Sequence, residues 1–216
     1  MQPGRAERVF TQKDVELALR EISAKDRIMA ALIERVGVCQ IPQGGDLFSD
    51  LVESMVYQQV TGKAAAAIFF KLLSETAGVI SPDRILSLSH DQMKNAGLSR
   101  QKISYITDLS ERVKSGELNL REISSKDDNT VIEELTKVKG IGIWTAQMFL
   151  IFTLGRIDVF PSGDFGIRRA IEKHYTFRGE LTEKKMQRIA HNWAPYRTIG
   201  TLMLWKSENT KLPQPA

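Results

Sequence analysis

The pattern of apolar and polar positions along this chain is typical of helices rather than strands. No stretch of strand length alternates convincingly between apolar and polar residues, and signals that begin and end helices recur instead. Thr61 precedes an alanine-rich apolar run that closes at Gly78, and Ser99 precedes a second run that closes near Gly116. The sequence therefore predicts an all-α protein of about ten short helices joined by short loops.

The spacing of capping residues predicts further helix starts. Ser89 and Gln92 have the spacing of a capping box, and so do Thr130 and Glu133. Pro195 stands where we expect the first turn of a late helix, a position that tolerates proline because its missing N–H has no helical partner.

Composition narrows the class of protein. The chain has 216 residues, of which 42% are hydrophobic and 26% are charged, values that are ordinary for a soluble globular protein with a real core. No apolar run approaches the length needed to cross a bilayer, and the first residues lack the apolar core of a signal peptide. We therefore expect an intracellular protein.

Charge and cysteine content exclude some kinds of site and permit others. The formal net charge of +4 permits nucleic-acid binding, although a modest excess of Lys and Arg is usually a solvated surface. The single cysteine, Cys39, excludes a disulfide framework and a four-cysteine zinc or iron–sulfur site, and we expect it to be a small buried residue. The histidines, His90, His174 and His191, lack metal-ligand spacing.

The most informative stretch surrounds a glycine-rich hairpin. The hairpin, V-K-G-I-G, contains Gly140 and Gly142, and an apolar helix over 143–154 follows it. An extended segment, DVFPSG, then leads to Asp164 at the start of another helix. The simplest interpretation is a pair of helices packed in a core, with the glycines acting only as turn residues.

The same hairpin has features that suit a phosphate. Glycines allow a sharp turn and the close approach of a ligand, and the N–H groups that begin the next helix face an anion. The expected DNA contacts of this region are Lys137, Lys139, Gly140, Gly142 and the hydroxyl of Thr145. The backbone carbonyls of the hairpin are candidates to hold a monovalent cation, Na⁺ or K⁺, and belong to Thr136, Val138 and Ile141.

The chain resembles the helix-hairpin-helix DNA glycosylases, and within them the alkylbase branch of DNA-3-methyladenine glycosylase II type. The hairpin matches as Val138-x-Gly140-Ile141-Gly142-x-x-x-Ala146, and the glycine/proline loop with its aspartate matches as Phe160-Pro161-Ser162-Gly163-Asp164. Further similar segments are QQVTGKAAAA from residue 58, GLSRQK from residue 97 and WAPYR from residue 193. These matches occur in the family's order along nearly the whole chain.

The resemblance implies the organisation of the fold. The chain is expected to form one catalytic unit over residues 1–216, built from two helical subdomains with the active site in the cleft between them. One subdomain is expected to comprise about 1–45 and 158–216, and the other about 46–157, including the hairpin motif at about 130–154.

The resemblance also implies the catalytic chemistry. Asp164 matches the carboxylate that stabilises an oxocarbenium-like sugar and orients or deprotonates the attacking water. Its alternative role is that of a helix N-cap, which contributes ~1 kcal/mol, and the two roles are compatible. Bifunctional members carry a Schiff-base lysine two residues after the second hairpin glycine, where this chain has Trp144. We therefore expect a monofunctional enzyme without AP-lyase activity.

The base pocket is expected to be aromatic. Trp144 and Trp205 match tryptophans of the alkylbase branch, and electron-rich rings attract a cationic alkylated purine by roughly 0.5–2 kcal/mol per contact. Met148 and Phe165 are expected to complete the pocket, although a methionine on an apolar helix is as readily a core residue.

Access to a damaged base requires that the base be flipped out of the duplex, at a cost on the order of a few kcal/mol. Gln59 matches the side chain that fills the resulting gap, and Thr61 in the same turn is expected to contact DNA. A buried capping role for Gln58 or Gln59 is the alternative, because Gln is less apolar than a typical wedge.

Together these features predict a monomeric base-excision-repair enzyme that acts on double-stranded DNA and releases bases of the 3-methyladenine and 7-methylguanine type. It is expected to require no cofactor and to lack an iron–sulfur cluster. One alternative is an enzyme of the same fold that acts on hypoxanthine, uracil or ethenoadducts. The other is a non-catalytic DNA-damage-binding module, against which the presence of Asp164 argues.

Overall fold

A computed structural model of the chain describes residues 11–39 and 45–208. These residues form thirteen α-helices and one π-helical segment, and they contain no β-strand. The prediction of an all-α protein is therefore confirmed. Several helices have only five or six residues, so their number exceeds the one expected from the sequence. None of the helices in this part of the chain is long and apolar enough to cross a membrane.

The described residues divide into two compact units. Unit 1 comprises residues 45–149, and unit 2 comprises residues 11–39 together with residues 150–208. Unit 2 is therefore assembled from two segments that are far apart in the sequence. The residues of unit 1 lie between these two segments along the sequence.

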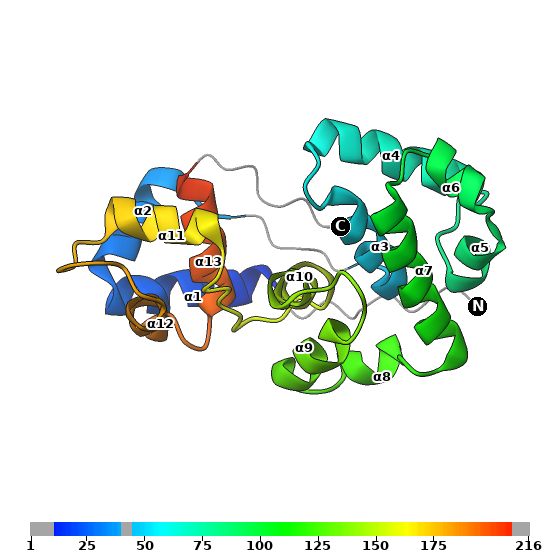
Figure 1. The fold of residues 1–216 in the computed structure, drawn as a ribbon. Helices are drawn as coiled ribbons and strands as arrows, with labels where there is room; N and C mark the ends of the chain where they lie inside the picture. Colours follow the sequence, from blue (N-terminus) through cyan, green and yellow to red (C-terminus); the bar gives the residue numbers. More distant parts are fainter. Residues whose placement is uncertain (1–10, 40–44, 209–216) are drawn as a thin grey trace. The chain divides into compact units, whose positions relative to one another are not determined.

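Unit 1 is organised around α7 (Arg100–Ser115), whose apolar residues Ile106 and Leu109 are completely buried. In this unit α7 packs against α3, α5 and α6, while α9 packs against α8 and α10 (Figure 1). The other helices of unit 1 are α3 (Leu47–Tyr57), α4 (Gly62–Glu75), α5 (Pro82–Ser87), α6 (His90–Asn95), α8 (Leu120–Ser124), α9 (Asp128–Thr136) and α10 (Ile143–Met148).

Unit 2 is organised around α13 (Arg197–Ser207), in which every residue from 198 to 205 is buried. The four other α-helices of the unit all pack against α13 (Figure 1). Because α13 is covered by these helices, it carries few charged residues. These helices are α1 (Gln12–Lys25), α2 (Arg27–Val36), α11 (Phe165–His174) and α12 (Glu183–His191).

A buried carboxylate joins several parts of unit 2. Asp26 caps α2 and also accepts hydrogen bonds from Nε1 of Trp193 at 2.9 Å and from the hydroxyl of Tyr175 at 2.7 Å. The side chains of Asp26 and Trp193 are buried. Because a buried polar group needs partners, this arrangement fixes the chain that precedes α13 against α2.

The helix that follows the hairpin changes its winding halfway. The apolar helix expected over 143–154 is present, but α10 ends at Met148 and continues as a π-helical segment, η1 (Phe149–Thr153). It stops before Gly155, which has a φ of +64°. Wider π-helical turns inside helices are frequent at functional sites.

Most of the predicted helix starts are confirmed, and two are wrong. Ser89 forms its capping box with Gln92, and Ser99 caps α7. However, α9 begins earlier than predicted because Asp127 is its cap, and Thr130 donates its hydroxyl to that aspartate instead of capping. Pro195 also precedes α13 rather than entering its first turn, because the N-cap of α13 is Tyr196.

Cys39 lies in unit 2 and is buried, as predicted. Burial raises the pKa of its thiol from 9.0 to about 11. Among the described residues, no group of three or more His, Cys, Asp or Glu side chains is arranged to hold a metal ion.

Candidate active site and hairpin

Asp164 stands at the N-terminus of α11, where its backbone is extended and its side chain caps the helix. Oδ1 accepts a hydrogen bond from the backbone N–H of Ile167 at 2.8 Å and a second from Nε1 of Trp205 at 2.9 Å. Only 8% of the surface of Asp164 is exposed. The predicted capping role is therefore confirmed, and the two N–H donors hold the carboxylate in one orientation.

Trp205 is enclosed rather than open. Its exposed fraction is 1%, and its ring stacks on Phe152 of η1 with centroids 6.0 Å apart and planes at 18°. A ring so enclosed presents no free face to a base in this structure. The structure instead makes Trp205 the hydrogen-bond partner of Asp164, and its predicted direct contact with the base stays a prediction.

The other predicted pocket residues differ in exposure. Met148 is buried, whereas 40% of Trp144 and 71% of Phe165 are exposed. Neither exposed ring is therefore part of the buried core of its unit. Trp144 and Met148 belong to unit 1, and Phe165 belongs to unit 2 with Asp164. That these residues act on the same base stays a prediction.

The segment before Asp164 is fastened to α13. Asp158 accepts hydrogen bonds from the backbone N–H of Arg197 at 3.0 Å and from its guanidinium at 2.7 and 2.8 Å. Thr198 accepts from the backbone N–H of Val159 at 3.0 Å and donates to the carbonyl of Arg156 at 2.6 Å. The approach to the candidate catalytic residue is therefore held by the same helix that carries Trp205.

The hairpin between α9 and α10 contains two glycines that differ in backbone conformation and in the space around them. Gly140 has a φ of +84°, and a Cβ atom there would overlap the ring of Tyr105. Gly142 has a φ of −96° and is the N-cap of α10, and a Cβ atom built on it would have no neighbour within 4 Å. Gly140 is therefore required by backbone conformation and by packing, whereas Gly142 leaves open space at the start of α10.

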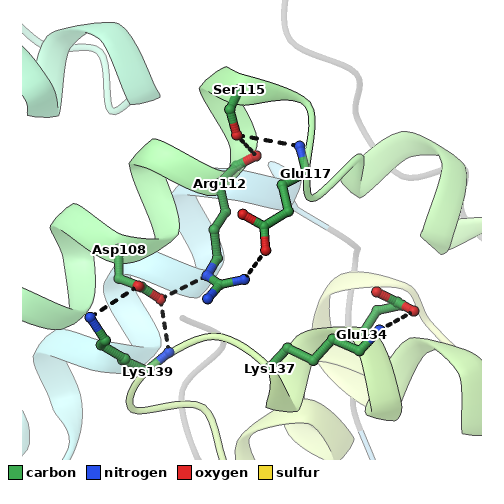
Figure 2. Close-up of polar contacts among 7 residues, drawn as sticks. All are labelled: Asp108, Arg112, Ser115, Glu117, Glu134, Lys137 and Lys139. Carbon is green, nitrogen blue, oxygen red and sulfur yellow. Dashed lines mark hydrogen bonds and ion pairs between the residues drawn. The ribbon is translucent and has the colours of Figure 1, made fainter.

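The two lysines of the hairpin are exposed, and each pairs with a carboxylate. Lys137 pairs with Glu134, with 2.7 Å between Nζ and Oε1. Lys139 donates its backbone N–H to Oδ2 of Asp108 at 3.0 Å, and its ammonium lies 3.4 Å from Oδ1 of the same carboxylate. Figure 2 shows Asp108 on α7 facing the hairpin, with Arg112 on its other side.

Asp108 is a residue that the sequence analysis missed. Burial favours its neutral form, but the hydrogen bonds from Lys139 and Arg112 outweigh that effect and lower its pKa. The signal in the sequence is local: Asp108 stands between the apolar residues Ile106 and Leu109, which are buried in the structure. An ionised carboxylate in such a place needs cationic or N–H partners.

The remaining residues of the hairpin lie mostly inside unit 1. Thr145 is only 5% exposed, so its hydroxyl has little surface to offer a phosphate. Val138 and Ile141 are buried, and the carbonyl of Val138 accepts the backbone N–H of Ile141 at 3.2 Å. A carbonyl has two lone pairs and can accept again. The predicted cation at the carbonyls of Thr136, Val138 and Ile141 stays a prediction.

The two glutamines in the turn between α3 and α4 have different surroundings, which suit a structural role and a wedge role respectively. Gln58 ends α3 and donates Nε2 to the carbonyl of Gly140 at 2.9 Å. Gln59 is exposed with a φ of +55°, a conformation uncommon for a residue with a side chain. Thr61 is the N-cap of α4 without a side-chain capping bond, and it is exposed. Gln58 therefore has the structural role, and Gln59 has the surface that a wedge requires.

Comparison with known proteins places the chain among DNA repair proteins. Residues 52–195 match the HhH-GPD superfamily of base excision DNA repair proteins. DNA-3-methyladenine glycosylase 1 of Schizosaccharomyces pombe is 35% identical over 165 residues, which cover 74% of this chain and 72% of that protein.

Solved structures of glycosylases share the fold. A DNA-3-methyladenine glycosidase from Bacillus halodurans aligns with a TM-score of 0.81 at 39% identity, covering 89% of both chains. A 3-methyladenine DNA glycosylase from Schizosaccharomyces pombe, in complex with abasic DNA, aligns with a TM-score of 0.78 at 29% identity, covering 89% of this chain and 97% of that one. These similarities confirm the fold that the sequence predicts.

Proposed function

Since this chain belongs to the HhH-GPD superfamily of base excision DNA repair proteins, we propose that it is a monofunctional DNA glycosylase that releases alkylated purines from double-stranded DNA. The observation that carries the mechanism is the carboxylate of Asp164, which is buried at the start of α11 and oriented by two N–H donors. The names of the similar proteins support 3-methyladenine as a representative substrate.

Asp164 supplies the negative charge of the proposed mechanism. An N3- or N7-alkylated purine is already a good leaving group because it carries a positive charge, so its departure needs no general acid. The sugar becomes oxocarbenium-like as the bond breaks, and a preorganised carboxylate stabilises that charge. The same carboxylate then orients or deprotonates the water that attacks the sugar carbon. The products are the free base and an intact abasic strand.

The proposed DNA contacts are in unit 1. The open space at Gly142 and the start of α10 suits a phosphate, and the exposed ammonium groups of Lys137 and Lys139 add positive charge beside it. Gln59, exposed at its turn, is the proposed side chain that enters the duplex when the base is flipped out. The contacts of the hairpin are to the DNA backbone, so binding is expected to fall steeply with salt and to depend little on sequence.

We propose that strand cleavage is absent from the reaction. A lyase needs an amine to form a Schiff base with the sugar, and the position that carries this lysine in bifunctional relatives is Trp144 here. The proposed enzyme acts as an intracellular monomer and needs no cofactor. A Na⁺ or K⁺ ion at the hairpin carbonyls is an optional structural addition.

The function is tested by measuring base release from defined substrates. Methylated DNA is incubated with the protein and the freed bases are separated by chromatography, while duplexes with single hypoxanthine, uracil and ethenoadenine lesions are assayed in parallel. We expect release of 3-methyladenine and 7-methylguanine. Release of only a neutral base would replace the proposed substrate class, and lesion binding without any release would identify a damage-binding module.

Treatment of the same reactions with alkali or with borohydride distinguishes glycosylase activity from lyase activity. Strands are expected to break only after alkali, because the enzyme leaves an intact abasic site. Borohydride is expected to trap no covalent protein–DNA adduct. A trapped adduct, or strand breaks before alkali, would contradict the monofunctional assignment.

A further inference from the structure

The two loops proposed to touch DNA are joined to each other within unit 1. The turn after α3 reaches the hairpin through Gln58, whose Nε2 donates to the carbonyl of Gly140 at 2.9 Å. Lys102 of α7 donates its ammonium to the carbonyl of Val56 at the end of α3. A cation is well placed there because the last carbonyls of a helix lack helical partners. The helix α7 therefore supports the turn directly and the hairpin through it.

A second link connects α7 to the hairpin at Asp108. Oδ2 of Asp108 accepts both the backbone N–H of Lys139 at 3.0 Å and Nε of Arg112 at 3.0 Å, while Oδ1 lies 3.4 Å from the Lys139 ammonium (Figure 2). Arg112 is held in turn by Glu117. The three links join turn, hairpin and α7 into a closed set of polar contacts.

We propose that Asp108 is a positioning residue for DNA binding, which holds the hairpin in its phosphate-binding conformation through the backbone N–H of Lys139. The proposal rests on the proposed function, because the hairpin must bind DNA for its conformation to matter. A negative charge beside a hairpin that binds phosphate opposes binding electrostatically. The presence of Asp108 is explained if the free energy that it contributes by ordering the hairpin exceeds the electrostatic cost of its charge.

The two effects of Asp108 are separable by substitution. Asp108→Asn and Asp108→Ala remove the same negative charge, so electrostatics cannot distinguish them. An Asn carbonyl in the place of Oδ2 still accepts the N–H of Lys139 and Nε of Arg112, whereas Ala accepts neither. Any difference in DNA affinity between the two variants therefore measures what the hydrogen-bond acceptor contributes to binding. Glu117→Ala is the matched control, because Glu117 contacts Arg112 and is one link further from the hairpin than Asp108.

The test measures the affinity of the full chain for a duplex that contains a stable abasic-site analogue, by fluorescence anisotropy at one salt concentration. We expect Asp108→Ala to bind about tenfold more weakly, because a hairpin that this acceptor no longer holds must be ordered when DNA binds. Asp108→Asn and Glu117→Ala are expected to stay within about threefold of the unmodified protein. Amide hydrogen exchange of Lys139 is expected to be faster in the Ala variant alone.

Each outcome decides one question. If the unmodified protein does not bind the duplex, the proposed function is wrong rather than this inference. If it binds, and Asp108→Ala binds equally well, or Asp108→Asn is as weak as Asp108→Ala, then Asp108 does not position the hairpin. If Asp108→Ala does not fold, Asp108→Asn decides alone: protection of the Lys139 amide together with retained affinity supports the inference, and loss of either contradicts it.

Discussion

The indole N–H of Trp205 donates a 2.9 Å hydrogen bond to Oδ1 of Asp164, the same oxygen that caps α11 by accepting the N–H of Ile167. One oxygen of the proposed catalytic carboxylate is thus used to fix its orientation. This contact changes what Trp205 is expected to do, since the side chain is buried and stacked on Phe152. We expect it to orient the carboxylate, and the direct contact with the base that the sequence predicts stays a prediction.

Asp164→Asn is expected to separate catalysis from folding. The Asn side-chain carbonyl can still accept the N–H groups of Ile167 and Trp205, and Asn is about as good an N-cap as Asp, so the melting temperature should stay near that of the unmodified protein. The variant lacks the negative charge that stabilises the sugar, so single-turnover base release should fall by ~10²–10³ or more, about 3–4 kcal/mol. A folded variant that releases 3-methyladenine within a few-fold of the unmodified rate would leave Asp164 as a cap only.

Trp205→Phe tests whether the indole positions Asp164 or selects the base. The change keeps an aromatic ring on Phe152 but removes the donor to Oδ1, a loss of about 1.5–3 kcal/mol for a hydrogen bond to a charged group. Positioning predicts similar rate losses, of about tenfold, for 7-methylguanine and for any neutral base, such as hypoxanthine, that the unmodified protein also releases. A loss confined to the cationic base would instead restore the cation–π role.

Trp193→Phe is the matched control for that experiment. Trp193 is equally buried in unit 2 and donates its Nε1 to another carboxylate, Asp26, at 2.9 Å. Its substitution should lower the free energy of unfolding by about 1–3 kcal/mol without changing base release at a temperature where the protein is folded. A rate loss as large as that of Trp205→Phe would attribute both effects to general destabilisation.

The hairpin glycines are expected to respond differently to alanine. A Cβ at residue 142 meets no atom within 4 Å, so Gly142→Ala should unfold like the unmodified protein while the added methyl group weakens DNA binding. Gly140→Ala combines a φ of +84° with overlap against Tyr105 and should lower stability, by about 1–3 kcal/mol for the backbone conformation alone. Urea unfolding and duplex binding measure the two effects. Unchanged binding by Gly142→Ala would show that no phosphate approaches the backbone closely at this glycine.

Cys39 is expected to resist thiol reagents in the folded protein. Burial raises the pKa of its thiol from 9.0 to about 11, so the thiolate fraction at pH 8 is lower by about a factor of one hundred than in the unfolded chain. The reaction should accelerate as the pH rises toward that pKa, and addition of denaturant should accelerate it at any pH. Rapid labelling of the native protein at pH 8 would contradict the buried position of Cys39.

Local features of the sequence determined much of this fold. A cap and the backbone N–H that donates to it lie three residues apart, so Ser89, Ser99 and Asp164 are recognisable as helix starts before any tertiary contact is known. The error at Thr130 has the same origin, because Asp127 is an equally good cap only three residues away and local spacing does not rank the two. The residues of the hairpin and of the loop before Asp164 likewise identified the family.

Only the tertiary structure decided how those pieces support one another. The contact between Trp205 and Asp164 joins residues 41 positions apart, and the contact between Lys139 and Asp108 joins residues 31 positions apart. Helical periodicity indicates that such positions are buried, but it does not specify which buried groups meet, because that depends on how α13 packs on α11 and how α7 packs beneath the hairpin. The sequence by itself therefore determined the helices, the family and the candidate catalytic carboxylate. The packing of helices decided that Trp205 meets Asp164, that Gly140 must lack a side chain and that Asp108 accepts the backbone N–H of Lys139.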